Sequence, residues 1–169
     1  HKRYLNDFFT GKHPGSDSRG ELYNDDPVTQ DARFCGTTAS MCGIEAALFE
    51  KNDEKLERGI REDLMLHAYM LTQSGIPMLY SSDEVGRLND YSYKDDPDKA
   101  ADSRYIHRGA FQWDLAKKRK SKTSVEGQIF QTLDRMEQIR RQESVFDKDC
   151  DVYTYDVHDD SILCILRQK

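Results

Sequence analysis

The feature that most constrains the fold is a short apolar run, Ile76 to Tyr80, with Gly75 before it and polar residues after it. The run is too short for a helix and is flanked by breakers, which is typical of a buried parallel strand. A long acidic loop follows and ends in Asp102-Ser103-Arg104. Such loops are uncommon unless they are functional, and α/β barrels place them at the rim of an active site. The sequence therefore predicts one barrel-type strand that leads into a functional loop.

Amphipathic helices flank this strand in the sequence. Apolar residues recur every three or four positions after Asn52 and again after Ser124, with charged residues on the opposite face. We expect long helices over 53–73 and 125–142 and shorter ones over 2–10, 38–50 and 113–116, with a loop from 12 to 32. The β-type runs 152–157 and 162–166 predict a hairpin. A helix, a short loop and a strand form half of a βαβ repeat, so the expected fold class is α/β.

The composition limits the partners. The chain has 169 residues, 33% of them charged and 37% hydrophobic, and a formal net charge of −6. This acidic balance argues against nucleic acid or an anionic membrane as the main partner, and we interpret the basic run 117–120 as a solvated surface turn. No apolar stretch is long enough to span a membrane. The four cysteines lack metal-ligand spacing, so we expect buried free thiols and a cytoplasmic location, with secretion left open.

The strand and its tail read Gly75-Ile76-Pro77, then Tyr80, then Ser82-Asp83-Glu84. This pattern resembles the eighth barrel strand of the α-amylase superfamily of glycoside hydrolases, which typically reads G-x-P-x-x-Y-x-G-D-E. Ser82 departs from it, because it stands at the usual glycine position.

Further motifs narrow the resemblance to amylosucrase and its sucrose-hydrolysing relatives, and they cover nearly the whole chain in the family's order. They are His1-Lys2 with Leu5 and Phe8-Phe9, Pro14-Gly15-Ser16 with Arg19-Gly20, Asp31-x-Arg33 with Gly36-Thr37 and Ala39, Glu84-Val85-Gly86, Leu88-Asn89-Asp90, Asp102-Ser103-Arg104 with His107-Arg108, Gly127-Gln128-Ile129, and Met136-x-x-x-Arg140.

The resemblance implies the C-terminal third of a (β/α)8 barrel that is mostly helical, with one buried parallel strand. Residues 1–50 would form the insertion after the seventh strand, and 51–145 the seventh helix, eighth strand, eighth loop and eighth helix. Residues 146–169 would form the first antiparallel strands of a truncated C-terminal β-domain. The chain starts within a helical pattern and ends within a strand pattern, so we interpret it as a piece of a longer protein.

In these enzymes a nucleophilic Asp and a general-acid Glu act by a retaining mechanism, and a His-Asp pair lies at the seventh strand; all would lie upstream of His1. We therefore expect no catalytic residue in this chain. The parent would be a glycosyl hydrolase or glucosyltransferase that acts on sucrose, with glucose or an α-glucan as further ligands. The chain alone would be inactive. No cofactor and no metal site are expected.

Four cations are candidate substrate-binding residues by this resemblance. Arg104 would pair with an Asp from the first barrel loop and close the glucose pocket, because a planar guanidinium holds a carboxylate bidentately. Arg33 and Arg19 would face the acceptor side of the pocket. At the position of Lys2 the related enzymes carry an arginine, and a lysine lacks the planar guanidinium that can donate two parallel hydrogen bonds. Solvated loop positions are the alternative, and for Arg104 an ion pair with Asp102 or Asp98.

The carboxylates Asp83, Glu84 and Asp102 are expected to be supporting groups at the rim of the site. Asp83 and Glu84 are adjacent, so their side chains should point to opposite sides and cannot act as a catalytic pair. His13, His107 and His158 lack ligand spacing, and the stretch from Asp90 to Asp102 lacks the pattern of a calcium loop.

Two alternatives stay open. One is another specificity of the superfamily, such as an α-amylase or a sucrose phosphorylase. The other is a non-catalytic helical module that binds carbohydrate or protein. The apolar faces of 53–73 and 125–142, together with the strand 76–80, also predict that the chain self-associates or repacks, with the strand paired to another copy or to the hairpin 152–166.

Overall fold

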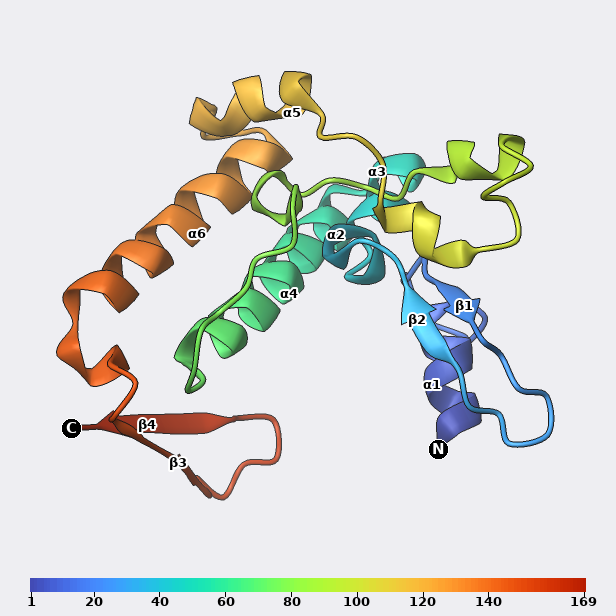
Figure 1. Ribbon diagram of the computed structural model, residues 1–169. Coiled ribbons are helices and arrows are strands. Elements are labelled where there is room, and N and C mark those ends of the chain that lie inside the picture. The colour runs from blue at the N-terminus through green and yellow to red at the C-terminus, as the bar shows by residue number, and fades with distance from the viewer.

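The computed structural model describes residues 1–169 as a mixed α/β chain (Figure 1). The helices are α1 (Lys2–Phe9), α2 (Thr38–Met41), α3 (Ile44–Glu50), α4 (Asp53–Thr72), α5 (Trp113–Lys117) and α6 (Val125–Gln142). The strands are β1 (Glu21–Tyr23), β2 (Arg33–Cys35), β3 (Asp151–Tyr155) and β4 (Cys164–Gln168). Short 3₁₀ helices lie between them: η1 (Asp83–Val85), η2 (Tyr91–Asp95), η3 (Ser103–His107), η4 (Lys118–Lys120) and η5 (Ser144–Phe146).

The two long helices form where the apolar periodicity predicts them. Each begins at a side-chain cap: Asn52 accepts a hydrogen bond from the Lys55 amide at 3.0 Å, and Ser124 accepts one from the Gly127 amide at 3.1 Å. Such caps satisfy amide groups that have no partner inside the helix. The expected helices over 2–10 and 113–116 are also confirmed.

The helix expected over 38–50 is divided into α2 and α3. Gly43 separates them, with a left-handed φ of 85° that a residue with a side chain rarely adopts. Apolar and small residues continue on both sides of this glycine, so the periodicity gave no sign of the break. Thr37 caps α2, since its hydroxyl accepts a hydrogen bond from the Ser40 amide at 3.3 Å.

The main core lies between α4, α6 and the α2–α3 pair. Its fully buried members are Ala39, Ile44, Ile60, Ile129 and Leu133, and Leu79 packs against them from the segment that follows α4. A second, smaller core of Cys35, Tyr93 and Ile106 lies under the long loop. The two cores connect the helices to the loop that the sequence singles out as functional.

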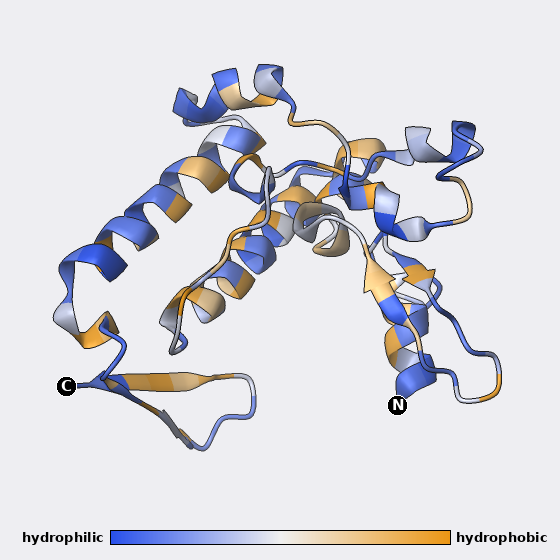
Figure 2. Cartoon of the chain, in the orientation of Figure 1, coloured by the Kyte–Doolittle hydropathy of each residue, from blue (hydrophilic) through white to orange (hydrophobic).

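The prediction of a buried parallel strand over 76–80 is wrong for this chain. The segment is extended, but Ile76 is 92% exposed and Met78 80% exposed, and no parallel strand pair exists. The backbone groups of residues 76–79 make no hydrogen bond. The reason is that this chain places no other strand beside the segment: β1–β2 and β3–β4 are separate antiparallel pairs. Figure 2 shows the segment as a largely hydrophobic stretch alongside α4.

The expected hairpin is confirmed, with β3 paired antiparallel to β4 and Thr154 opposite Ile165. It does not pair with segment 76–80, so that expected rearrangement is wrong. The short β1–β2 pair, with Tyr23 opposite Arg33, was not expected, because strands of three residues carry no readable alternation.

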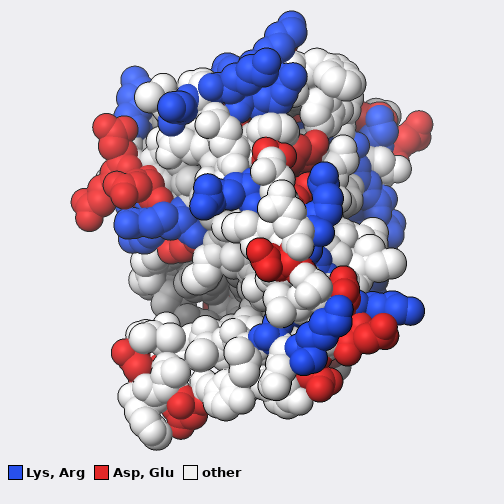
Figure 3. Space-filling model, turned by 90° about the vertical axis from the view of Figure 1, so that its left-hand side faces the viewer, with Lys and Arg blue, Asp and Glu red and all other residues white.

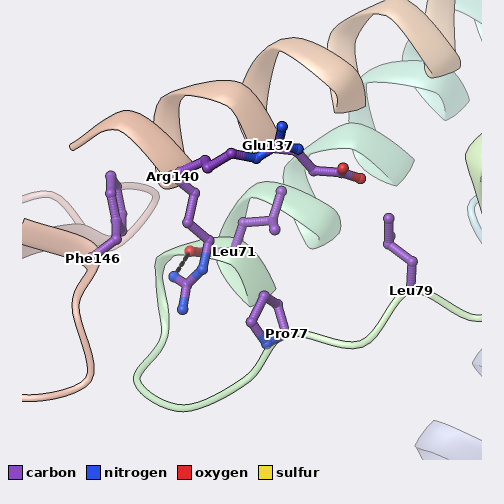
Figure 4. Close-up of a pocket in the computed structure, with 7 residues that line it drawn as sticks. Leu71, Pro77, Leu79, Glu137, Arg140 and Phe146 are labelled. Atoms are coloured by element: carbon purple, nitrogen blue, oxygen red, sulfur yellow. Dashed lines mark hydrogen bonds between the residues drawn. The ribbon is translucent and has the colours of Figure 1, made fainter. Parts of the chain in front are cut away.

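Two arginines cap the C-terminal end of α4 and join it to the rest of the chain. Arg140 of α6 donates to the carbonyls of Leu71, Gln73 and Gly75, and Figure 4 shows its guanidinium reaching down to the end of α4 beside Pro77. Arg167 of β4 donates to the Thr72 carbonyl at 3.1 Å. The carbonyls at a helix C-terminus have no partner inside the helix, so cations there are favourable.

Candidate functional site

The long loop after segment 76–80 is held to the N-terminal part of the chain by Asn89. Its side-chain carbonyl accepts a hydrogen bond from the Thr37 amide at 2.8 Å, and its side-chain amide donates to the Arg19 carbonyl. The backbone N–H of Asn89 donates to the Ser40 hydroxyl at 2.9 Å. The motif residues Arg19, Thr37 and Asn89, far apart in sequence, therefore meet at one place.

Arg104 and Arg33 both lie next to Tyr23. The Arg104 guanidinium lies over the Tyr23 ring, 4.3 Å from its centroid, which is cation–π geometry. Arg33 is directly opposite Tyr23 across the β1–β2 pair, so the two side chains share one face. The sequence singled out both arginines, but it missed Tyr23, whose only signal was its place within a turn-rich loop.

The carboxylate partner of Arg104 within this chain is Asp102. Nε of Arg104 lies 2.8 Å from Asp102 Oδ1, and Nη2 lies 2.6 Å from Oδ2, a bidentate pair. The pair lowers the pKa of Asp102 to about 2. The Arg104 side chain remains 40% exposed, so its outer edge is accessible to a ligand.

Arg104, Arg33 and Tyr23 form the Tyr23 cluster, and neither Lys2 nor Arg19 makes a hydrogen bond or an ion pair with its members. Lys2 forms an ion pair with Asp31 at 2.5 Å, and both side chains are largely exposed. Such a pair contributes little to stability because solvent screens it. Arg19 is half-buried and donates from its guanidinium to the Ser18 carbonyl at 3.1 Å.

Asp83 and Glu84 have different surroundings, as their adjacency predicts. The Asp83 carboxylate is buried and accepts a hydrogen bond from the Thr38 hydroxyl at 3.2 Å. Glu84 lines a hollow of about 300 Å³ together with Phe111, Trp113 and Phe130. The two carboxylates therefore contact different parts of the chain.

A buried histidine, His67 of α4, lies beside Asp83 and was missed by the sequence reasoning. Its Nε2 is 3.7 Å from Asp83 Oδ2, and its Nδ1 is 3.3 Å from Oδ2 of Asp63, also on α4. The signal was available in the sequence, because an acid and a histidine four positions apart lie on one side of a helix, here with Ile60 and Leu71.

His107 links the loop to the end of segment 76–80. Its ring meets the Tyr80 ring edge-on, with 5.5 Å between centroids. Burial, followed by the charge of Arg108, lowers the pKa of His107. His107 and Arg104 are three residues apart on the 3₁₀ helix η3, so they lie on the same side of it. His107 therefore links η3, which carries Arg104, to Tyr80 at the end of segment 76–80.

The basic run 117–120 is exposed, and two of its four charges are paired locally. Lys117 binds Asp114 at 2.7 Å, and Lys118 binds Glu126 at 2.9 Å. Figure 3 shows lysine and arginine side chains gathered at the top of the molecule, where α5 and η4 lie. The same face has a hollow above the hairpin. The pocket in Figure 4, of about 440 Å³, lies between α4, α6 and segment 76–80, and another pocket of about 450 Å³ lies within the long loop, lined by Tyr93, Tyr105 and Arg108.

The cysteines are free thiols, three of them buried and Cys164 partly exposed. Burial raises the pKa of the Cys42 thiol to about 12, so it is unreactive as a nucleophile. No group of three or more His, Cys, Asp or Glu side chains is placed to hold a metal ion.

No model of a known protein family matches this chain. None of its helices has the length and apolar character needed to cross a membrane.

Proposed function

We propose that this chain is the C-terminal part of the catalytic barrel of a sucrose-acting glycoside hydrolase or transglucosylase, similar to amylosucrase. The observation that carries the proposal is the unpaired extended segment 76–80. It lies along α4 and α6 with Leu79 turned into the core, and the backbone groups of residues 76–79 have no partner. An extended segment with free backbone groups is prepared to join a sheet. A barrel whose other strands lie outside this chain supplies such a sheet, with 76–80 as its eighth strand.

The loop chemistry is consistent with this role. The Tyr23 cluster joins two arginines and one aromatic ring, and a sugar offers such a site hydroxyl groups for the arginines and an apolar ring face for the tyrosine. Within the complete barrel, Arg104 would turn from Asp102 to a carboxylate of the first barrel loop and close the glucose pocket. Arg33 would face the acceptor, which is water in hydrolysis and a glucan hydroxyl in transfer.

The bond-breaking groups belong to the rest of the barrel in this proposal. A retaining glycosidase needs two carboxylates about 5–5.5 Å apart, one to attack and one to protonate the leaving oxygen. Asp83 is tied to Thr38 beside His67, and Glu84 lines another hollow, so these two cannot cooperate in that way. Residues 1–50, 51–145 and 146–169 would be the insertion, the barrel part and the start of the β-domain.

The experiment is to determine the reading frame upstream of His1, express the complete protein and measure glucose release from sucrose. We expect in-frame strands with the nucleophilic Asp and the acid Glu, activity on sucrose, and a large loss of kcat/KM in Arg104→Ala. The 169-residue chain alone, as the matched control, should release no glucose above the blank. A reading frame that begins with Met directly before His1 would refute the proposal in favour of a binding module.

A further inference from the structure

The groups around His67 form a small buried polar cluster inside an otherwise apolar interface. Asp63 is 0% exposed, His67 5% and Asp83 9%. Asp63 and His67 come from α4, and Asp83 comes from η1 at the start of the long loop. Buried charges are costly unless they are paired, so this cluster needs a physical reason.

The ring nitrogens of His67 face only oxygen acceptors. Nδ1 is 2.8 Å from the Asp63 carbonyl oxygen and 3.3 Å from Asp63 Oδ2, while Nε2 points to Asp83 Oδ2 at 3.7 Å. A neutral imidazole has one donor nitrogen and one acceptor nitrogen, whereas an imidazolium has two donors. The surroundings therefore fit the charged form, because in the neutral form one ring nitrogen would face an oxygen lone pair.

We propose that His67 is a positioning residue, held as an imidazolium between two carboxylates, that fixes Asp83 and with it the turn 82–86 from which the long loop starts. This inference does not depend on the sucrose-acting function. Deprotonation of His67 would release Asp83 and loosen the turn, so the stability of the turn depends on the charged state of His67.

The turn itself shows why it needs such a tether. Ser82 has a left-handed φ of 81°, which is unfavourable for a residue with a side chain, and its buried hydroxyl has no hydrogen-bond partner. The turn closes through hydrogen bonds from the Val85 and Arg87 amides to the Ser82 carbonyl, each 3.2 Å long. A strained turn of this kind persists only when neighbouring contacts hold it in place.

The charged and titratable groups around the cluster agree with this assignment. Burial lowers the pKa of His67, but the interactions of its ring with Asp63 and then Asp83 outweigh burial and raise this pKa to about 10. Burial raises the pKa of Asp63, and the contact with His67 and the charge of His67 act against this rise. At the α2–α3 junction, burial and then the charges of Asp63, Glu62 and Asp83 raise the pKa of the Cys42 thiol, so the thiol stays neutral. On the loop side, Asp83 and Arg87 face His107. No other cation takes the place of His67 between the two carboxylates.

The test uses the full chain labelled with ¹⁵N and with ¹³C in its methyl groups. The imidazole ¹⁵N shifts of His67 should report two protonated nitrogens at pH 7 and a change to the neutral ring only near pH 10. The methyl signals of Val85, which is buried in the turn, should shift with the same midpoint. The signals of the exposed His158 serve as the internal reference.

A variant gives an independent readout. In His67→Gln, which keeps a polar side chain without the charge, the Val85 and Arg87 amides should exchange at least tenfold faster at pH 7, and the alkaline methyl shift of Val85 should disappear. His158→Gln is the matched control and should change neither. A neutral His67 at pH 8 in the wild type would overturn the proposal, as would a Val85 signal that does not follow the His67 titration. These wild-type measurements decide the matter even if the variant does not fold.

Discussion

Replacing Arg140 by Met tests the idea that its guanidinium holds the chain from the C-terminal end of α4 to Gly75, where segment 76–80 begins. Arg140 donates to the carbonyl of Leu71, to that of Gln73 at 3.3 Å, and to that of Gly75 at 2.9 Å. Its guanidinium also lies 5.5 Å from the Phe146 ring centroid. Met keeps much of the aliphatic stem, so the substitution removes mainly the charge and the hydrogen bonds.

The size of the effect follows from these contacts. A hydrogen bond from a charged group contributes about 1.5–3 kcal/mol to the free energy of unfolding, so three such bonds would together contribute several kcal/mol. Two effects reduce it. Burial and the charge of the nearby Arg167 lower the pKa of Arg140, so holding it charged here has a cost, and water can reach the freed Gly75 carbonyl. We expect Arg140→Met to lower the free energy of unfolding by about 2–4 kcal/mol.

Urea denaturation followed by circular dichroism measures this loss, and hydrogen exchange locates it. Amides between 72 and 80 should lose protection before those in the middle of α4. Arg141→Met is the matched control, because the neighbouring Arg141 is exposed, and it should change the free energy of unfolding by less than about 0.5 kcal/mol. If Arg140→Met is as mild as Arg141→Met, the guanidinium does not hold this end of the helix and the reasoning is wrong.

Three further predictions concern the core, the turn and the loop. Ile129→Ala should cost about 2–5 kcal/mol of unfolding free energy in urea, because the side chain is fully buried, whereas Met65→Ala on the exposed side of α4 should cost under about 1 kcal/mol. Gly86→Ala should lower the thermal midpoint, because Gly86 has a φ of 59° and a new Cβ would lie 2.5 Å from Ile129 Cδ1; an unchanged midpoint would contradict this. The depressed pKa of Asp102 means that its pair with Arg104 stabilises the loop above about pH 4 and is lost as pH falls through about 2. Carboxyl ¹³C shifts should show that midpoint, and it should move upward in Arg104→Gln.

The sequence predicts those parts of the fold that depend on local pattern. α4 and α6 repeat apolar residues at helical spacing and start at Asn52 and Ser124, so both their existence and their starts could be predicted. The strand at 76–80 could not be predicted correctly, because a strand is defined by its neighbours. Half-buried and exposed residues do alternate there, with Pro77 and Leu79 turned toward the helices, but no partner strand lies beside them.

The candidate site shows the same limit for side chains. Arg104 and Arg33 could be selected one by one, but only through the resemblance of the motifs Asp102-Ser103-Arg104 and Asp31-x-Arg33, because a cation in a long loop alone does not indicate a binding role. Their common neighbour Tyr23 could not be found, because it depends on the short β1–β2 pair that brings positions 23 and 33 together. The link between His67 and Asp83 likewise joins a helix to a turn, which no spacing in the sequence reveals.

The contacts divide the chain into a part of high local stability and a part of lower local stability. The helices α4 and α6 share a close-packed core, so mutations there should act on global stability. The loop and segment 76–80 are attached to this core by a few apolar side chains, such as Leu79 and Leu88, and by polar contacts of single residues: Asn89, Arg140 and His67. Regions held by few contacts open at lower free energy than the core around them. Because each polar contact fixes a different end of the loop or segment, their loss should loosen the candidate site while the helices stay folded.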